Sequence, residues 1–319
     1  MLADVARAFV GAGSLTEKQG AVLVASAGAM FSVTAIAHAA VVDASDFQFL
    51  TYRGASTALA MVGLVVVRRS SRPVDFGGLT PTVWLAGSLL AGTSMLYILA
   101  LSRTTAATTL ILIAAAPVVA AVIGAVWLGE RVEATTAAAI GITSVGVLIT
   151  AGAGLAVGTT SGLVLAGCLP VAVGIYSVLM RTAASVDPVV PTLISGMMLG
   201  VASAGVALTQ GSLVVSWRDL AMASVSGGLA LGVGLPMFNL GHRSVPAAKI
   251  PLLLMTEVVL APLWVWIWPG EAPNGATLLG GAVILGSVAW LATMSRTVPV
   301  SAPSSAAADI PAPVARWGS

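Results

Sequence analysis

One apolar pattern occurs twice in this chain, and this repeat limits the possible folds more than any other feature. An apolar stretch, a short arginine-bearing turn and a longer apolar stretch end at residues 127–130 (WLGE), and the same order ends again at residues 268–271 (WPGE). At this offset of about 141 residues, Gly87 corresponds to Gly228. A duplicated membrane unit is the usual architecture of a secondary transporter.

The composition places the chain in a lipid bilayer. Hydrophobic residues make up 58% of it and charged residues only 8%, with a mean hydropathy of +1.01, whereas a soluble domain carries roughly 25% charged residues. The net charge of +2 gives no reason to expect a nucleic-acid partner. One cysteine and two histidines are too few ligands for a typical Cys/His metal site. Neither a metal nor a cofactor is therefore predicted.

Ten segments are long and apolar enough to cross a bilayer, which takes about 20 residues each. The predicted spans are 20–41, 48–67, 82–101, 105–128, 134–154, 161–181, 189–210, 219–240, 248–268 and 275–295. We expect residues 1–19 to form an N-terminal tail and residues 296–319, which are rich in Ser, Ala and Pro, to be disordered.

Loop charges predict which side of the membrane each loop occupies. With both termini in the cytoplasm, the outer loops hold only Arg103 and Arg218. The cytoplasmic segments then hold Arg7, Lys18, Arg68, Arg69, Arg72, Arg131, Arg181, Arg243, Lys249, Arg296 and Arg316. This is a strong positive-inside bias. It predicts a multi-pass protein with two cytoplasmic ends.

The repeat and the span count together predict the fold class. Residues 20–154 and 161–295 each hold five spans, an odd number, so the second unit enters the membrane from the opposite side. We therefore expect an all-α membrane protein of ten transmembrane helices, built as two inverted five-helix repeats around a central cavity that opens alternately to each side.

The pattern resembles the EamA family of the drug/metabolite transporter superfamily over about residues 20–295. The motifs that carry this resemblance are residues 97–101 (YILAL), 106–107 (AA), 116–117 (AP) and 128–130 (LGE), together with Arg53 after an aromatic-rich start and Glu257 with Pro262 in the ninth span. The resemblance implies a bundle in the inner membrane that moves small metabolites such as amino acids, often outward.

Glu257 is the strongest candidate for function. It lies near the middle of its span, where a carboxylate costs roughly 2.5–3.5 kcal/mol on insertion scales. Such a group usually faces a cavity and binds a cation, an amine or a proton, although a structural carboxylate paired within the bundle is the alternative. A proton is therefore a candidate coupling partner beside the small-molecule substrate.

Five further side chains are candidates for substrate binding or coupling. Arg53 could bind a substrate carboxylate, extend to lipid headgroups, or pair with Asp43 or Asp46. His38 ends the first span at the same level, and a packed or solvated role is the alternative. The remaining candidates, Tyr97, Tyr176 and Asn239, could line the cavity or simply pack with their polar groups bonded to neighbours.

Two other classes of function compete with transport. An intramembrane enzyme needs a cluster of nucleophile and base or of metal ligands, and the few ionisable residues here are scattered. A membrane sensor or structural protein would leave the inverted repeat without a purpose. No Walker motif is present, so ATP is not the predicted energy source, and the sequence does not reveal the oligomeric state.

Overall fold

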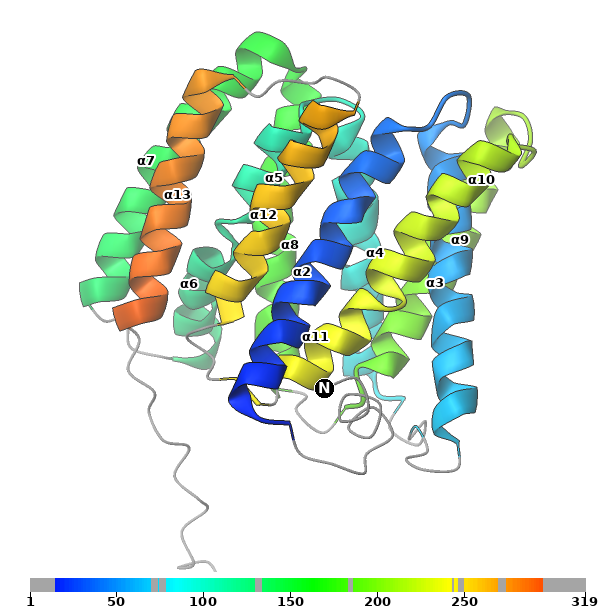
Figure 1. Cartoon of the computed structure of the whole chain (residues 1–319), viewed down its shortest axis with the longest axis horizontal. Coiled ribbons are helices and arrows are strands. Elements are labelled where there is room, and N and C mark those ends of the chain that lie inside the picture. The colour runs from blue at the N-terminus through cyan, green and yellow to red at the C-terminus, as the bar shows by residue number, and fades with distance from the viewer. Residues whose placement is uncertain are drawn as a thin grey trace, which may run out of the picture.

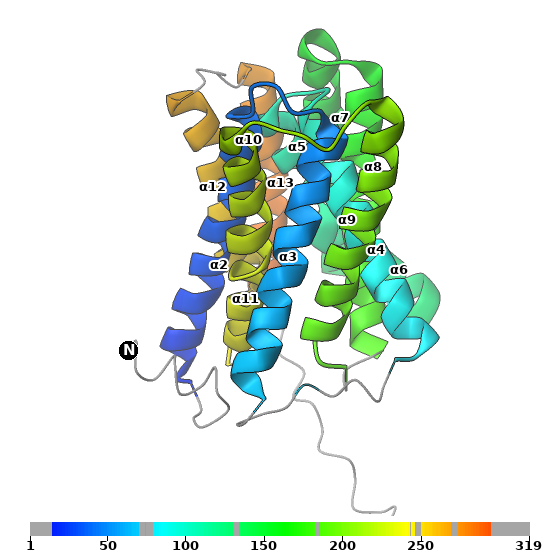
Figure 2. The same cartoon turned by 90° about the vertical axis from the view of Figure 1, so that its right-hand side faces the viewer.

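The computed structural model describes residues 15–69, 74, 79–129, 134–182, 186–242, 244–245, 250–268 and 274–294. Within these ranges the chain is helical, without strands, and the helices run side by side between two faces (Figures 1 and 2). We call the face at which α2 ends and α3 begins the upper face, as it is drawn in Figure 1.

The first half contains α2 (Glu17–Ala39), α3 (Asp46–Arg68), α4 (Pro81–Leu101), α5 (Ala106–Ile113), α6 (Ala116–Leu128) and α7 (Ala134–Val157). The second half contains α8 (Thr160–Thr182), α9 (Val189–Gln210), α10 (Trp217–Ser224), the π-helix η1 (Val225–Leu231), α11 (Gly234–His242), α12 (Ile250–Ile267) and α13 (Gly275–Met294). The segment 1–14, predicted as tail, and the predicted disordered segment 296–319 lie outside the described residues.

Seven helical stretches in the described ranges are long and apolar enough to cross a bilayer, and they coincide with the first four predicted spans and with the sixth, seventh and eighth. Shorter apolar helices occupy the predicted fifth, ninth and tenth spans, at residues 137–152, 256–267 and 275–290. The prediction of an all-helical, multi-pass membrane protein is therefore confirmed. The arrangement of ten spans as two repeats stays a prediction.

Two of the predicted spans are interrupted rather than continuous. The fourth breaks at Ala114 and Ala115, between α5 and α6, because Pro117 in the first turn of α6 lacks the N–H that would continue the helical ladder. The eighth consists of α10, η1 and α11 in succession. A π-helical segment of this kind is rare and occurs frequently at functional sites.

The first helix begins at Glu17, three residues before the start of the first predicted span. The reason is a capping box: the Thr16 hydroxyl accepts from the Gln19 N–H at 3.3 Å, and the Gln19 side chain accepts from the Thr16 N–H at 3.0 Å. Figure 1 shows that α2 starts and α13 ends at the same, lower face.

Glycines bring the helices of the two halves into close contact at two crossings. Where α3 crosses α9, a Cβ on Gly54 would lie 2.4 Å from the backbone nitrogen of Gly200. Where α7 crosses α13, a Cβ on Gly146 would lie 2.9 Å from the carbonyl oxygen of Gly280. Small residues allow such backbone contact in a bilayer, where hydrophobicity alone does not drive helices together.

Candidate functional site

The centre of the candidate site is a buried arginine. Arg53 lies seven residues into α3, which is about 10 Å below its upper end at 1.5 Å per residue, and only 3% of it is exposed. Its Nε donates to the Ser94 hydroxyl of α4 at 3.0 Å, and its Nη1 donates to the Thr34 hydroxyl of α2 at 3.2 Å. Nη1 also donates to the carbonyl oxygen of Ser226 in η1 at 3.2 Å and to the Ser226 hydroxyl. Four elements, α2, α3, α4 and η1, therefore meet at this guanidinium.

The approach of η1 to α3 depends on a glycine. A Cβ on Gly227 would lie 2.1 Å from the Arg53 carbonyl oxygen and 2.2 Å from the Ser56 hydroxyl, so no larger residue fits. The Thr57 hydroxyl closes this contact by donating to the Gly227 carbonyl oxygen at 3.2 Å. The glycine thus allows Ser226, the next residue back along η1, to reach the arginine.

Tyr97 and Glu257 add an unpartnered hydroxyl and a carboxylate to the same region. Tyr97 on α4 is 7% exposed, and its buried hydroxyl has no hydrogen-bond partner among the described residues. Glu257 on α12 is half-buried and interacts electrostatically with Arg53 and Tyr97. In the described part of the chain no hydrogen bond or ion pair within 4 Å joins Glu257 to another side chain.

This arrangement combines a positioned cation, a carboxylate of opposite charge and a free hydroxyl donor between membrane helices. Ionisable groups in such places are costly to insert and usually face a bundle interior or a cavity. Glu257 itself keeps part of its surface accessible. The site can therefore bind a small polar or charged solute by hydrogen bonds and by charge.

Two of the alternatives for Arg53 do not fit this geometry. Its side chain is buried inside the bundle instead of extending to headgroups, and within the described ranges it forms no ion pair with Asp43 or Asp46. Instead, three hydroxyls and the Ser226 carbonyl oxygen accept from its Nε and Nη1.

The other predicted residues form no described hydrogen bond with Arg53. His38 packs at the upper face, where its ring meets Phe49 edge-on and its Nε2 lies 3.2 Å from the Ser102 hydroxyl and 3.6 Å from an Asp46 carboxylate oxygen. Tyr176 on α8 and Asn239 on α11 are both half-buried. No hydrogen bond given by the described residues connects either of them to Arg53.

A carboxylate that the sequence analysis missed joins two segments at the upper face by hydrogen bonds. Asp219 in the first turn of α10 is almost fully buried, and its two oxygens accept from the backbone N–H groups of Val42, Asp43 and Ala44, each at 3.0 Å. These bonds tie the connection between α2 and α3 to the start of α10. The pattern from Ser216 to Asp219 resembles a capping box and was the only signal that marked this residue.

The long apolar helices and the polar cluster buried between them define a multi-pass membrane protein with an internal polar site. Among the described residues, no group of three or more His, Cys, Asp or Glu side chains comes together that could hold a metal ion.

The comparisons with known proteins agree with this class. Residues 18–152 match the model of the EamA-like transporter family, which confirms the family resemblance over this part of the chain. One solved crystal structure superposes with a TM-score of 0.64 at 20% identity, over 87% of this chain and 99% of the other. At this identity the likeness shows a common fold. A search of curated proteins finds no match.

Proposed function

We propose that this protein is a secondary transporter, which moves a small solute across the inner membrane by alternating access to the site around Arg53, Tyr97 and Glu257. The observation that carries the proposal is the buried guanidinium, held by hydroxyls from separate helices beside a carboxylate and a free tyrosine hydroxyl. The match of residues 18–152 to a family of transporters supports it.

The pairing of helices supports two inverted five-helix units. At the crossing of α7 and α13, Gly146 packs on the Gly280 carbonyl, and the Ser287 hydroxyl donates to the Ala139 carbonyl at 3.0 Å. At the repeat offset of about 141 residues, Gly146 corresponds to Ser287, and Ala139 corresponds to Gly280. Each contact is therefore the symmetry counterpart of the other, as a two-fold axis in the membrane plane requires.

The charges of the site favour a solute with both an acidic and a basic group, such as an amino acid or a related metabolite. The Arg53 guanidinium suits a carboxylate, and the Glu257 carboxylate suits an ammonium group. The outward direction of transport and the cytoplasmic position of both termini are parts of this proposal, supported by the family and by the positive-inside distribution of loop arginines.

A thermal-shift screen of the purified protein against amino acids and other metabolites is the first test. A stabilising solute is then followed by flux into proteoliposomes at two pH values. We expect solute movement without chemical change. A solute that binds but is never moved under any gradient would argue for a sensor, and a chemically altered solute would argue for an enzyme.

Glu257→Gln tests the role of the carboxylate, with Asp43→Asn at the exposed upper face as the matched control. The Gln variant keeps the shape of the side chain and removes its titratable group. We expect it to insert normally and to lose flux or the pH dependence of flux, whereas Asp43→Asn transports as the wild type does. Flux of Glu257→Gln equal to the wild type at every pH would exclude Glu257 from the mechanism.

A further inference from the structure

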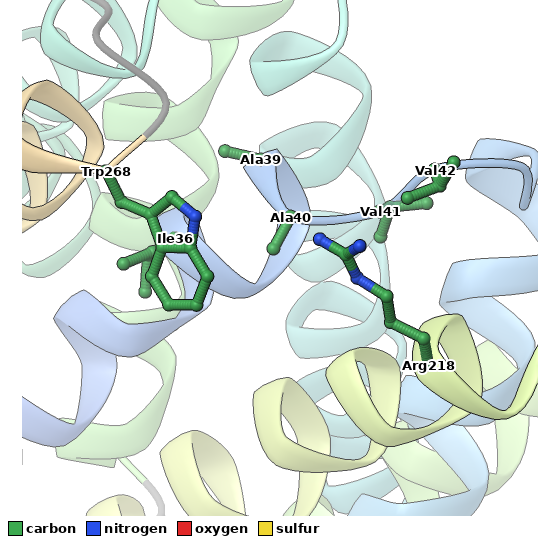
Figure 3. A pocket seen from close by; sticks show the side chains of 7 residues that line it. All are labelled: Ile36, Ala39, Ala40, Val41, Val42, Arg218 and Trp268. Carbon is green, nitrogen blue, oxygen red and sulfur yellow. The ribbon is translucent and has the colours of Figure 1, made fainter.

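A groove on the upper face lies between the end of α2, the start of α10 and the end of α12 (Figure 3). Its volume is about 340 Å³, at the low end of the roughly 300–1,000 Å³ of small-ligand sites. Most of its wall is apolar and includes Ile36, Val41 and Val42. Two side chains with polar groups, Arg218 and Trp268, complete the lining.

The guanidinium of Arg218 is available to a ligand. Figure 3 shows it extending from the start of α10 toward Ala40, while Trp268 lies beyond Ala40 at the end of α12. Arg218 is exposed, and in the described ranges its side chain forms no hydrogen bond or ion pair. The neighbouring Asp219 does not compensate its charge through a direct contact, because the Asp219 oxygens accept from three backbone N–H groups.

The same three hydrogen bonds make the wall of the groove rigid. Val42 lines the groove, and its N–H donates to the carboxylate of Asp219 at 3.0 Å. Asp219 is the residue that follows Arg218 in the chain. The connection between α2 and α3 is thus fixed before any ligand arrives. A preformed site loses less conformational entropy on binding than a mobile one.

The groove lies at the level of the lipid headgroups. It sits at the ends of two candidate membrane spans and of the shorter apolar helix α12. The two tryptophans of this region, Trp217 and Trp268, are 83% and 70% exposed, as expected for side chains of the interfacial belt. Below it, α12 exposes Leu263 and Ile267 to the surroundings of the bundle. In a bilayer, acyl chains cover such a surface.

We propose that this groove binds a phospholipid, whose phosphate pairs with Arg218, whose glycerol region lies beside Trp268, and whose acyl chains follow the exposed apolar face of α12. The planar guanidinium matches the geometry of a phosphate and binds it by charge-assisted hydrogen bonds. This site is separate from the buried Arg53 cluster, and its occupation does not depend on whether the protein transports a solute.

Native mass spectrometry of delipidated protein in detergent tests the proposal. The probes are phosphatidylglycerol, diacylglycerol with the same acyl chains, and water-soluble glycerol phosphate. We expect phosphatidylglycerol to bind at least about tenfold more tightly than diacylglycerol, the factor typical of one charge-assisted contact. Arg218→Gln should remove this preference, and Arg218→Lys should keep part of it.

Arg103→Gln is the matched control, since Arg103 is also a cation of the upper face but donates to the Leu99 carbonyl and does not line the groove. It should leave the preference for phosphatidylglycerol unchanged. Equal binding of phosphatidylglycerol by the wild type and Arg218→Gln would overturn the proposal. So would equal binding of the two lipids, or displacement of phosphatidylglycerol by glycerol phosphate, which would indicate a site for a soluble anion.

Discussion

Replacing Gly227 by alanine should separate η1 from α3 and disturb the buried arginine. The added Cβ would lie 2.1 Å from the Arg53 carbonyl oxygen, whereas close C···O contacts in proteins lie at about 3.3–3.6 Å. The π-helix must therefore move away by roughly 1.2–1.5 Å. This movement breaks the 3.2 Å bond from Thr57 to the Gly227 carbonyl and withdraws Ser226 from Arg53.

The expected cost is the sum of two effects. Overpacking of a tight contact costs about 1–3 kcal/mol, and loss of a hydrogen bond to a charged group costs about 1.5–3 kcal/mol. We therefore expect Gly227→Ala to lower the free energy of unfolding by roughly 2.5–6 kcal/mol. Thermal unfolding of the purified protein in detergent should show this as a clearly lower midpoint.

The neighbouring residue provides a matched control. A Cβ on Gly228 meets nothing closer than 3.8 Å, the distance to the Ser56 Cβ, so Gly228→Ala adds the same methyl group to the same element without overlap. Its stability should stay near that of the wild type. Equal unfolding midpoints for Gly227→Ala and Gly228→Ala would refute the reasoning that this contact holds η1 against Arg53.

Three further changes test other parts of the structure. Asp219→Asn should weaken the loop it holds, which hydrogen exchange would report as faster exchange of the N–H groups of residues 42–44; unchanged exchange would contradict the role of the carboxylate. Tyr97→Phe removes a hydroxyl without a described partner, so it should lower solute affinity and leave the free energy of unfolding unchanged. A large loss of stability would show that the hydroxyl has a partner within the protein. A double-mutant cycle on Arg68 and Asp187, which pair at 2.7 Å, should give a coupling of about 1 kcal/mol that declines with added salt; a coupling of zero would assign the pair no stabilising role.

Hydropathy predicted the positions of the helices well because each span must satisfy its backbone hydrogen bonds internally and bury about 20 residues in lipid. It did not predict the π-helix at residues 225–231, since an apolar stretch has the same hydropathy whichever helical turn it adopts. The helix α2 also begins before the first predicted span, because polar residues near Glu17 are held in the helix by the Thr16 cap.

The ionisable members of the candidate site were visible in the sequence, and their partners were not. Arg53 and Glu257 stand out because charged residues are rare inside spans. Thr34, Ser94 and Ser226 resemble the many other hydroxyl residues of this chain, and only the packing of their helices brings them to the guanidinium. One-dimensional patterns give the depth of a residue in the membrane but not which helices will meet around it.

The most direct test of the account is two-sided access to the central site. Ser94 contacts Arg53, and Cys168 is the single cysteine of the chain, so Ser94→Cys in a Cys168→Ser background provides one thiol beside the site. Membrane-impermeant thiol reagents would be applied to each face of proteoliposomes, with and without a solute found by the thermal-shift screen. The account predicts labelling from both faces, in proportions that the solute changes. Labelling from one face alone under every condition, or from neither, would contradict it.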